Sequence, residues 1–158
     1  MIPFYALPDT VSIFGLSFHS FGLLVALGIL VVWFLTIHRG VQYGLPQPVI
    51  ERAALHALLW GLPLSHVFDV LWYSPHEVIT NPLKLFALWD GLSSFGGFLG
   101  GTIGVVWYFR RSGHSLLIGA EAIVQGMIAA WIFGRAGCAS IHDHIGIPTD
   151  FFLGVYFP

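Results

Sequence analysis

Residues 92–113 read LSSFGGFLGGTIGVVWYFRRSG, and this stretch decides how the chain folds. Positions 92–109 carry no charged side chain and approach the roughly 20 apolar residues that an α-helix needs to cross a bilayer. Two arginines and then Gly113 follow, which is typical of a helix that ends at the membrane surface in a tight turn. The stretch therefore predicts a membrane-spanning helix.

The glycines of this predicted span form a stripe. Gly96, Gly100 and Gly104 recur every four residues, with Gly97 and Gly101 beside them, so one helix face has almost no side chain. Such a stripe lets another helix approach closely, which is the commoner use of small residues at this spacing. The second interpretation is a slot for a lipid, in which Gly96 and Gly97 contact phospholipid.

Three further apolar stretches are long enough to span a membrane, at 21–37, 53–73 and 116–133. Composition agrees, because 56% of the 158 residues are hydrophobic and 9% are charged, whereas soluble domains carry about 25% charged residues. The mean hydropathy is +0.82. We therefore predict a single all-α membrane domain over residues 1–158, a polytopic helical bundle with about four transmembrane helices.

The same composition excludes several classes of function. A net charge of −2 leaves no broad basic surface for nucleic acid. Cys138 is the single cysteine, so an intrachain disulfide or a multi-cysteine metal site cannot form. We expect no cofactor and no resident metal.

The segments between the predicted spans are expected to lie at the membrane surface. The first 20 residues, with prolines at positions 3 and 8, are predicted to form an interfacial arm. Residues 74–90 hold two more prolines and an apolar run, which indicates an interfacial or re-entrant element. Residues 134–158 are predicted to form a periplasmic segment.

The positive side chains predict the orientation, because loops rich in Lys and Arg stay in the cytoplasm. Four lie in the connections after the first and third spans and two lie on the other side: Arg39, Arg52, Arg110 and Arg111 against Lys84 and Arg135. Both termini are therefore predicted outside. Since no Lys or Arg precedes the first span, we expect no cleavable signal peptide there.

Polar residues inside the spans are candidates for function, because ionisable groups at membrane depth are costly. His66 and Asp69 are three residues apart and share a helix face, with His56 further toward the cytoplasmic end. They form either a proton relay or a structural hydrogen bond between His66 and Asp69. Glu121 and Gln125 form a second pair, which favours a polar contact between helices.

The segment GRAGCASIHDHIGIPTD, residues 134–150, gathers most of the remaining chemistry. Arg135 can clamp a phosphate through two nitrogens while its stem stays in the apolar layer, or it can serve as an anchor at the headgroups. Cys138 is a nucleophile by its chemistry, although a buried free cysteine usually behaves as a small hydrophobe.

His142, Asp143 and His144 place two imidazoles and a carboxylate on one predicted loop. They can act as an acid–base group, or they can join His66 and Asp69 in a metal or proton site. A surface loop bonded to its own backbone is the structural alternative.

Five blocks of the sequence resemble the prolipoprotein diacylglyceryl transferase family. They are FHSFGLL at 18–24, VLWY at 70–73, PLKLFALWDGLSSFGG at 82–97, GRAGC at 134–138 and GIPTDFFLGVYFP at 146–158. The resemblance implies a transferase of the bacterial inner membrane that moves a diacylglyceryl group from phosphatidylglycerol to the cysteine thiol of a prolipoprotein. The implied partners are phosphatidylglycerol or a similar anionic phospholipid, and prolipoprotein signal peptides.

Carried over residue by residue, the resemblance assigns Arg135 to the signature arginine that contacts the phospholipid headgroup and Gly146 to the later glycine of that signature. Other positions depart from the family. Phe95 stands where the family has a histidine, and His66 where it has an arginine. The family's later spans, which bear another arginine, have no counterpart in these residues.

Two further positions depart as well, since Phe21 replaces a tyrosine of the first motif and Cys138 replaces the signature asparagine. These departures leave two hypotheses. One is an active transferase with altered catalytic residues. The alternative is a non-catalytic phospholipid-binding membrane paralogue that has lost the catalytic histidine and the later spans.

Transfer to a thiol requires a base, because a thiol of pKa about 8.5 must first lose its proton. Phe95 cannot serve, so the candidate bases are the histidines on the outer side: His66, His142 and His144. Asp143 and Asp69 are expected to support them. Arg135 is expected to match the charge of the departing glycerol phosphate.

Overall fold

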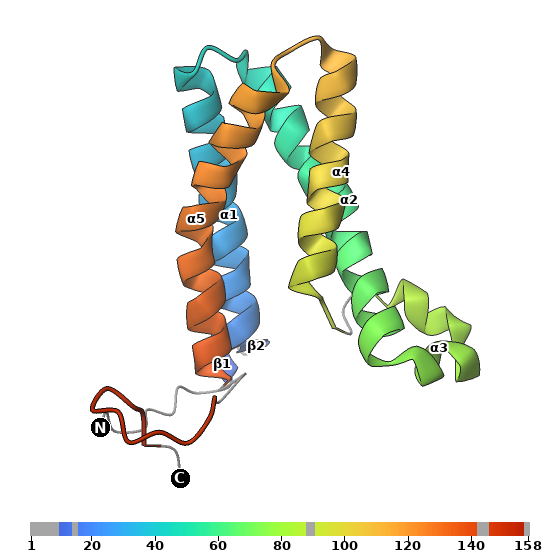
Figure 1. Ribbon diagram of the computed structural model, residues 1–158, viewed down its shortest axis with the longest axis vertical. Coiled ribbons are helices and arrows are strands. Elements are labelled where there is room, and N and C mark those ends of the chain that lie inside the picture. The colour runs from blue at the N-terminus through green and yellow to red at the C-terminus, as the bar shows by residue number, and fades with distance from the viewer. Residues whose placement is uncertain (1–9, 14–15, 88–90, 142–145, 157–158) are drawn as a thin grey trace. The chain divides into compact units, whose positions relative to one another are not determined.

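The computed structural model describes residues 10–13, 16–87, 91–141 and 146–156. Most of these residues are helical (Figure 1). The elements in chain order are β1 (Thr10–Ile13), β2 (Leu16–His19), α1 (Ser20–Gln42), α2 (Gln47–Tyr73), α3 (Pro75–Thr80), the 3₁₀ helix η1 (Pro82–Phe86), α4 (Ser94–Ser112) and α5 (Leu116–Ser140). The predicted all-α membrane bundle is confirmed.

Three of the predicted spans fall within α1, α2 and α5, and the fourth, 92–109, overlaps α4, which begins two residues later at Ser94. Among the described residues, α1, α2 and α5 are long and apolar enough to cross a membrane. Helix α4 has 19 residues but does not belong to this group. Its glycines and its two terminal arginines lower its mean hydropathy, so the crossing of α4 stays a prediction.

The arm before α1 contains strands, which the sequence analysis did not predict. Strands β1 and β2 pair antiparallel, with Thr10 opposite His19 and Val11 opposite Phe18. The β-branched and aromatic residues of these two segments favour strand pairing. Whether this hairpin lies at the membrane interface stays a prediction.

The chain divides into two compact parts, residues 1–32 with 127–158 and residues 33–126, and each is described by itself. In the first part, α1 packs on α5 through small residues. A Cβ at Gly28 would lie 3.3 Å from the carbonyl oxygen of Ala130, and one at Gly137 would lie 3.0 Å from the ring of Phe21. The absence of these side chains lets the two helices approach.

In the second part, the glycine stripe of α4 packs on the backbone of α2. Gly96, Gly100 and Gly104 are buried. They face three carbonyl oxygens that also recur every four residues, those of Leu64, Trp60 and His56. A Cβ on any of these glycines would overlap the oxygen it faces. The packing interpretation of the stripe is therefore confirmed, and α2 rather than a lipid chain fills the groove along these three glycines.

The connections follow the predicted punctuation. Helix α2 ends at Tyr73, Pro75 opens α3 at its first position and Pro82 opens η1. Gly113 ends α4 in the left-handed conformation, with φ of 71°, and α5 begins at Leu116. Glycine adopts this conformation without a steric penalty, so the tight turn predicted there is confirmed.

Candidate functional site

His66 holds the segment before α4 onto α2. Its side chain is fully buried, with 0% of its surface exposed. Nδ1 lies 3.1 Å from the carbonyl oxygen of Gly91, and Nε2 lies 2.9 Å from that of Lys84. A neutral imidazole carries one N–H and can donate to one of these oxygens, whereas a doubly protonated ring donates to both. This geometry favours a positioning role for His66 over that of a general base, which needs an accessible nitrogen.

Asp69 faces the same segment one helical turn further along α2. Its carboxylate lies against Gly91, where a Cβ would overlap Oδ2. Gly91 also has a φ of 93°, a conformation that favours glycine. Both this backbone conformation and the nearby Asp69 carboxylate therefore require glycine at position 91. Among the described residues, no hydrogen bond joins His66 to Asp69. The structural hydrogen bond considered from the sequence is therefore not formed, and each residue contacts Gly91 instead.

Ser65 and Ser93 add a reciprocal pair of hydrogen bonds that the sequence analysis missed. The Ser65 hydroxyl donates to the carbonyl oxygen of Ser93 at 2.7 Å, and the Ser93 N–H donates to the carbonyl oxygen of Ser65 at 3.1 Å. Both residues are buried. The signal available in the sequence was a serine beside a histidine inside an apolar span. Together with His66, this pair fixes the entry into α4.

The first turn of α4 presents Phe95 at the surface. Its side chain is 66% exposed, and its ring centroid lies 5.2 Å from that of Phe68. Gly97 is half-buried beside Ser65, while Gly96 is buried against α2. Phospholipid contact at Gly96 or Gly97 stays a prediction, and the close packing leaves Gly97 the more accessible of the two.

Arg135 belongs to the other part of the chain and lies on α5, within the last two turns of the helix. Helix α5 continues to Ser140, past the predicted end of the span at 133, so the segment GRAGCAS is helical. Arg135 is exposed, and no described residue forms an ion pair or a hydrogen bond with its side chain. The guanidinium is therefore available to an anion.

Cys138 follows Arg135 by three residues and so shares its helix face. The thiol is free, and the residue is half-buried. The hydroxyl of Ser140 donates to the carbonyl oxygen of Gly137 at 2.7 Å and closes the last turn. This places a reduced sulfur close to the predicted phosphate ligand along one helix.

His142, Asp143 and His144 lie outside the described residues, so their predicted acid–base role stays a prediction. Gly146 is exposed with a φ of 94°. Within the described ranges, no group of three or more His, Cys, Asp or Glu residues could hold a metal ion.

The remaining polar residues of the spans have structural partners. Gln125 donates to the hydroxyl of Tyr43 at 2.7 Å and to Glu121 at 3.4 Å, which connects α5 to the end of α1. His56 donates from Nδ1 to the carbonyl oxygen of Arg52, 2.7 Å away. Its ring packs on two aromatic residues of α4 (Trp107 and Tyr108). The polar contact between helices predicted for Glu121 and Gln125 is thus formed through Gln125.

Long apolar helices packed through glycine, with polar groups buried inside them, define the class of this molecule as an integral membrane protein with several helices. The sequence matches the prolipoprotein diacylglyceryl transferase family over residues 8–158, so the chain belongs to this family. Together with the three apolar helices, this membership makes it a bacterial inner-membrane protein.

Curated relatives carry the same family description. The chain is 27% identical over 149 residues to phosphatidylglycerol–prolipoprotein diacylglyceryl transferase 2 of Clostridium perfringens, covering 92% of this chain and 57% of that protein. It is 28% identical over 150 residues to the Clostridium tetani enzyme of that description, covering 95% and 60%. For the Pseudomonas putida F1 enzyme the identity is 27% over 165 residues, covering 100% and 60%. The chain thus spans about three fifths of the length of these relatives.

Proposed function

We propose that this chain binds phosphatidylglycerol and takes part in the transfer of its diacylglyceryl group to the cysteine thiol of a prolipoprotein. The observation that carries the proposal is the exposed Arg135, the single basic residue of α5, which no described side chain neutralises. A guanidinium in this setting can bind a phosphate diester through two parallel hydrogen bonds. The printed names of the relatives add the substrate and the acceptor.

The reaction requires three events at one site. The thiol loses its proton, its sulfur forms a bond to the glyceryl carbon, and the bond between that carbon and the phosphate oxygen breaks. The electron pair leaves with glycerol phosphate. Arg135 binds the phosphate in the substrate and stabilises the charge that develops on the departing group.

The proton acceptor is His142 or His144, with Asp143 orienting the ring. His66 and Asp69 are assigned a positioning role, because both contact Gly91 and so help to hold the entry into α4. Gly146 is assigned, with Arg135, to the phospholipid headgroup. On α4, phospholipid contact is assigned to Gly97, because Gly96 is buried against α2. Both termini face the periplasm in this proposal, so Arg135 meets lipid of the outer leaflet.

A second candidate function is favoured by Phe95. A side chain without acid–base chemistry, 66% exposed, occupies the position at which the resemblance implies a catalytic histidine. A phospholipid-binding membrane paralogue without transferase activity accounts for Phe95 and for Arg135 together.

The test is mass spectrometry of a peptide that carries a lipoprotein signal, incubated with the purified protein and phosphatidylglycerol vesicles. We expect a thioether-linked diacylglyceryl product. Arg135→Ala is expected to lower the rate at which this product forms by about a hundredfold, because two or more charge-assisted hydrogen bonds are lost. Arg52→Ala is the matched control, because Arg52 is an exposed arginine on another helix.

The outcomes separate the two functions. Binding of phosphatidylglycerol without any product supports the paralogue. If Arg135→Ala leaves both headgroup binding and transfer at the level of Arg52→Ala, the phosphate clamp is wrong.

A further inference from the structure

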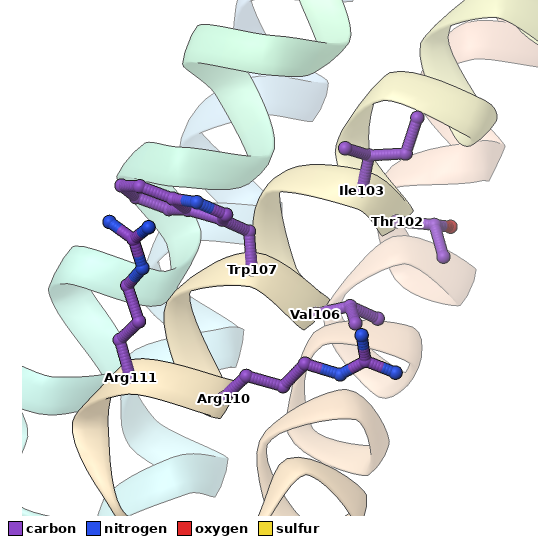
Figure 2. A pocket seen from close by; sticks show the side chains of 6 residues that line it. All are labelled: Thr102, Ile103, Val106, Trp107, Arg110 and Arg111. Atoms are coloured by element: carbon purple, nitrogen blue, oxygen red, sulfur yellow. The ribbon is translucent and has the colours of Figure 1, made fainter.

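A hollow of about 470 Å³ lies along the last turns of α4, in the part of the chain formed by residues 33–126 (Figure 2). Its lining residues all come from this one helix: Thr102, Ile103, Val106, Trp107, Arg110 and Arg111. It shares no lining residue with the candidate site described above. Neither the polar contacts of His66 nor the exposed Arg135 takes part in it.

The hollow is apolar along its length and cationic at one end. Ile103 and Val106 contribute aliphatic surface, whereas Arg110 and Arg111 precede the end of the helix at Ser112. At 1.5 Å per residue, the distance along the axis from Thr102 to Arg110 is about 12 Å. This length suits the upper part of an acyl chain beneath a headgroup.

The two arginines have different surroundings. The guanidinium carbon of Arg111 lies 4.3 Å from the ring centroid of Trp107, a cation–π contact that holds this side chain in place. Figure 2 shows Arg111 beside Trp107, while Arg110 extends toward the side on which Val106 and Thr102 project. Arg110 is exposed and forms no ion pair with any residue that the structure describes. Its charge is therefore available at the mouth of the hollow.

We propose that this hollow binds one anionic phospholipid, with its phosphate diester held by Arg110 and its acyl chain against Ile103 and Val106. The lining contains two cations and no carboxylate, so it complements a negatively charged headgroup. In the orientation predicted from the positive side chains, this lipid belongs to the cytoplasmic leaflet. It is then a resident lipid and not the substrate bound by Arg135.

An arginine at the end of a spanning helix can also serve only as an anchor among the headgroups. An anchor requires positive charge alone, whereas a binding site requires the planar guanidinium and the apolar hollow beside it. Arg110→Lys keeps the positive charge and removes the planar guanidinium. Val106→Phe keeps the charge and fills the hollow. These two variants therefore distinguish a site from an anchor.

The experiment is a native mass spectrometry titration of the purified, delipidated protein with dioleoyl phosphatidylglycerol or dioleoyl phosphatidylcholine. It uses an Arg135→Ala background, which separates this site from the proposed substrate site. We expect one tightly bound phosphatidylglycerol, about tenfold to a hundredfold weaker binding in Arg110→Gln from the loss of hydrogen bonds between charged groups, and unchanged binding in the control Arg52→Gln. Arg110→Lys and Val106→Phe are expected to weaken binding as well.

Three results would each overturn the proposal. They are equal affinity for both lipids, equal affinity in Arg110→Gln and Arg52→Gln, and full binding in Arg110→Lys and Val106→Phe. Glycerol phosphate is added as a competitor, and complete displacement of the lipid by this headgroup alone would show that the hollow contributes nothing. The midpoint of thermal unfolding, measured by circular dichroism, confirms that each variant is folded.

Discussion

At the scale of single residues, His66 explains how a loop is fastened to a membrane helix. Its two ring nitrogens meet the carbonyl oxygens of Gly91 and Lys84, 25 and 18 residues along the chain. The Lys84 carbonyl also accepts the N–H of Ala87, so the Gly91 carbonyl depends on His66 more strongly. A polar group that loses its hydrogen-bond partner away from water costs about 1–3 kcal/mol.

We therefore expect His66→Leu to lower the free energy of unfolding by about 1–3 kcal/mol, because it removes the polar ring that meets these carbonyl oxygens from a fully buried side chain. His66→Gln retains a donating amide, so its free energy of unfolding is expected to fall less. Thermal unfolding in detergent, followed by circular dichroism, measures both. His56→Gln is the control, since His56 donates to a carbonyl of its own helix. A stability of His66→Leu equal to that of His56→Gln would contradict the positioning role.

At the scale of elements, the pairing of α2 with α4 depends on one of the two glycine faces of α4. Gly100 is buried, and a Cβ there would overlap the carbonyl oxygen of Trp60. Gly101 is its neighbour in the sequence, yet a Cβ there would lie 3.6 Å from the carbonyl oxygen of Ala57, an ordinary contact. The two positions thus form a natural matched pair.

Gly100→Ala is expected to cost about 1–3 kcal/mol of stability, because overpacking forces the two helices apart. Gly101→Ala is expected to raise stability by about 0.5–1 kcal/mol, because alanine is the better helix former and no backbone atom is overlapped there. Alanine gains the same helix propensity over glycine at both positions. The difference in the free energy of unfolding between the two variants therefore measures the packing alone. Equal stability of the two variants would show that α4 does not rest on α2 through this face.

At the scale of the whole molecule, the number of membrane crossings depends on α4. Helices α1, α2 and α5 have the length and apolarity of spans, and α4 follows from its packing on α2 and from its terminal arginines. Since irregular backbone is not tolerated in lipid, a helix of 19 residues packed along α2 is expected to cross with it.

This expectation can be tested by cysteine labelling in a Cys138→Ser background. A cysteine introduced by Asn81→Cys lies after α2 and one introduced by Ser115→Cys lies after α4. If α4 crosses the membrane, a membrane-impermeant maleimide applied to intact spheroplasts labels the first position and not the second. Labelling of both positions from the same side would mean that α4 does not cross.

Much of the architecture could be predicted from local properties of the sequence. Apolar length located the four long helices, and proline and glycine located their ends, because a bilayer demands these features of each segment separately. Two local features were not predicted. The β1–β2 hairpin is short, and the segment after 133 continues as α5 because GRAGCAS holds no proline to stop it.

The candidate site was less predictable. The sequence placed His66 beside Asp69 on one helix face, but spacing along a helix cannot tell which distant backbone oxygen a side chain will meet. Likewise, the glycine stripe allowed either a helix or a lipid, and only the packing of α2 on α4 decided between them.

The sequence by itself determined that this is a helical membrane protein of the prolipoprotein diacylglyceryl transferase family, with Arg135 as its predicted phosphate ligand. The tertiary structure alone decided that His66 binds backbone carbonyls, that α2 fills the groove of Gly96, Gly100 and Gly104, and that Arg110 borders a hollow on α4. The physical reason is that the free energy of transferring a side chain into lipid depends on that residue alone. Hydrogen bonds and close packing, in contrast, depend on partners that only the folded chain brings together.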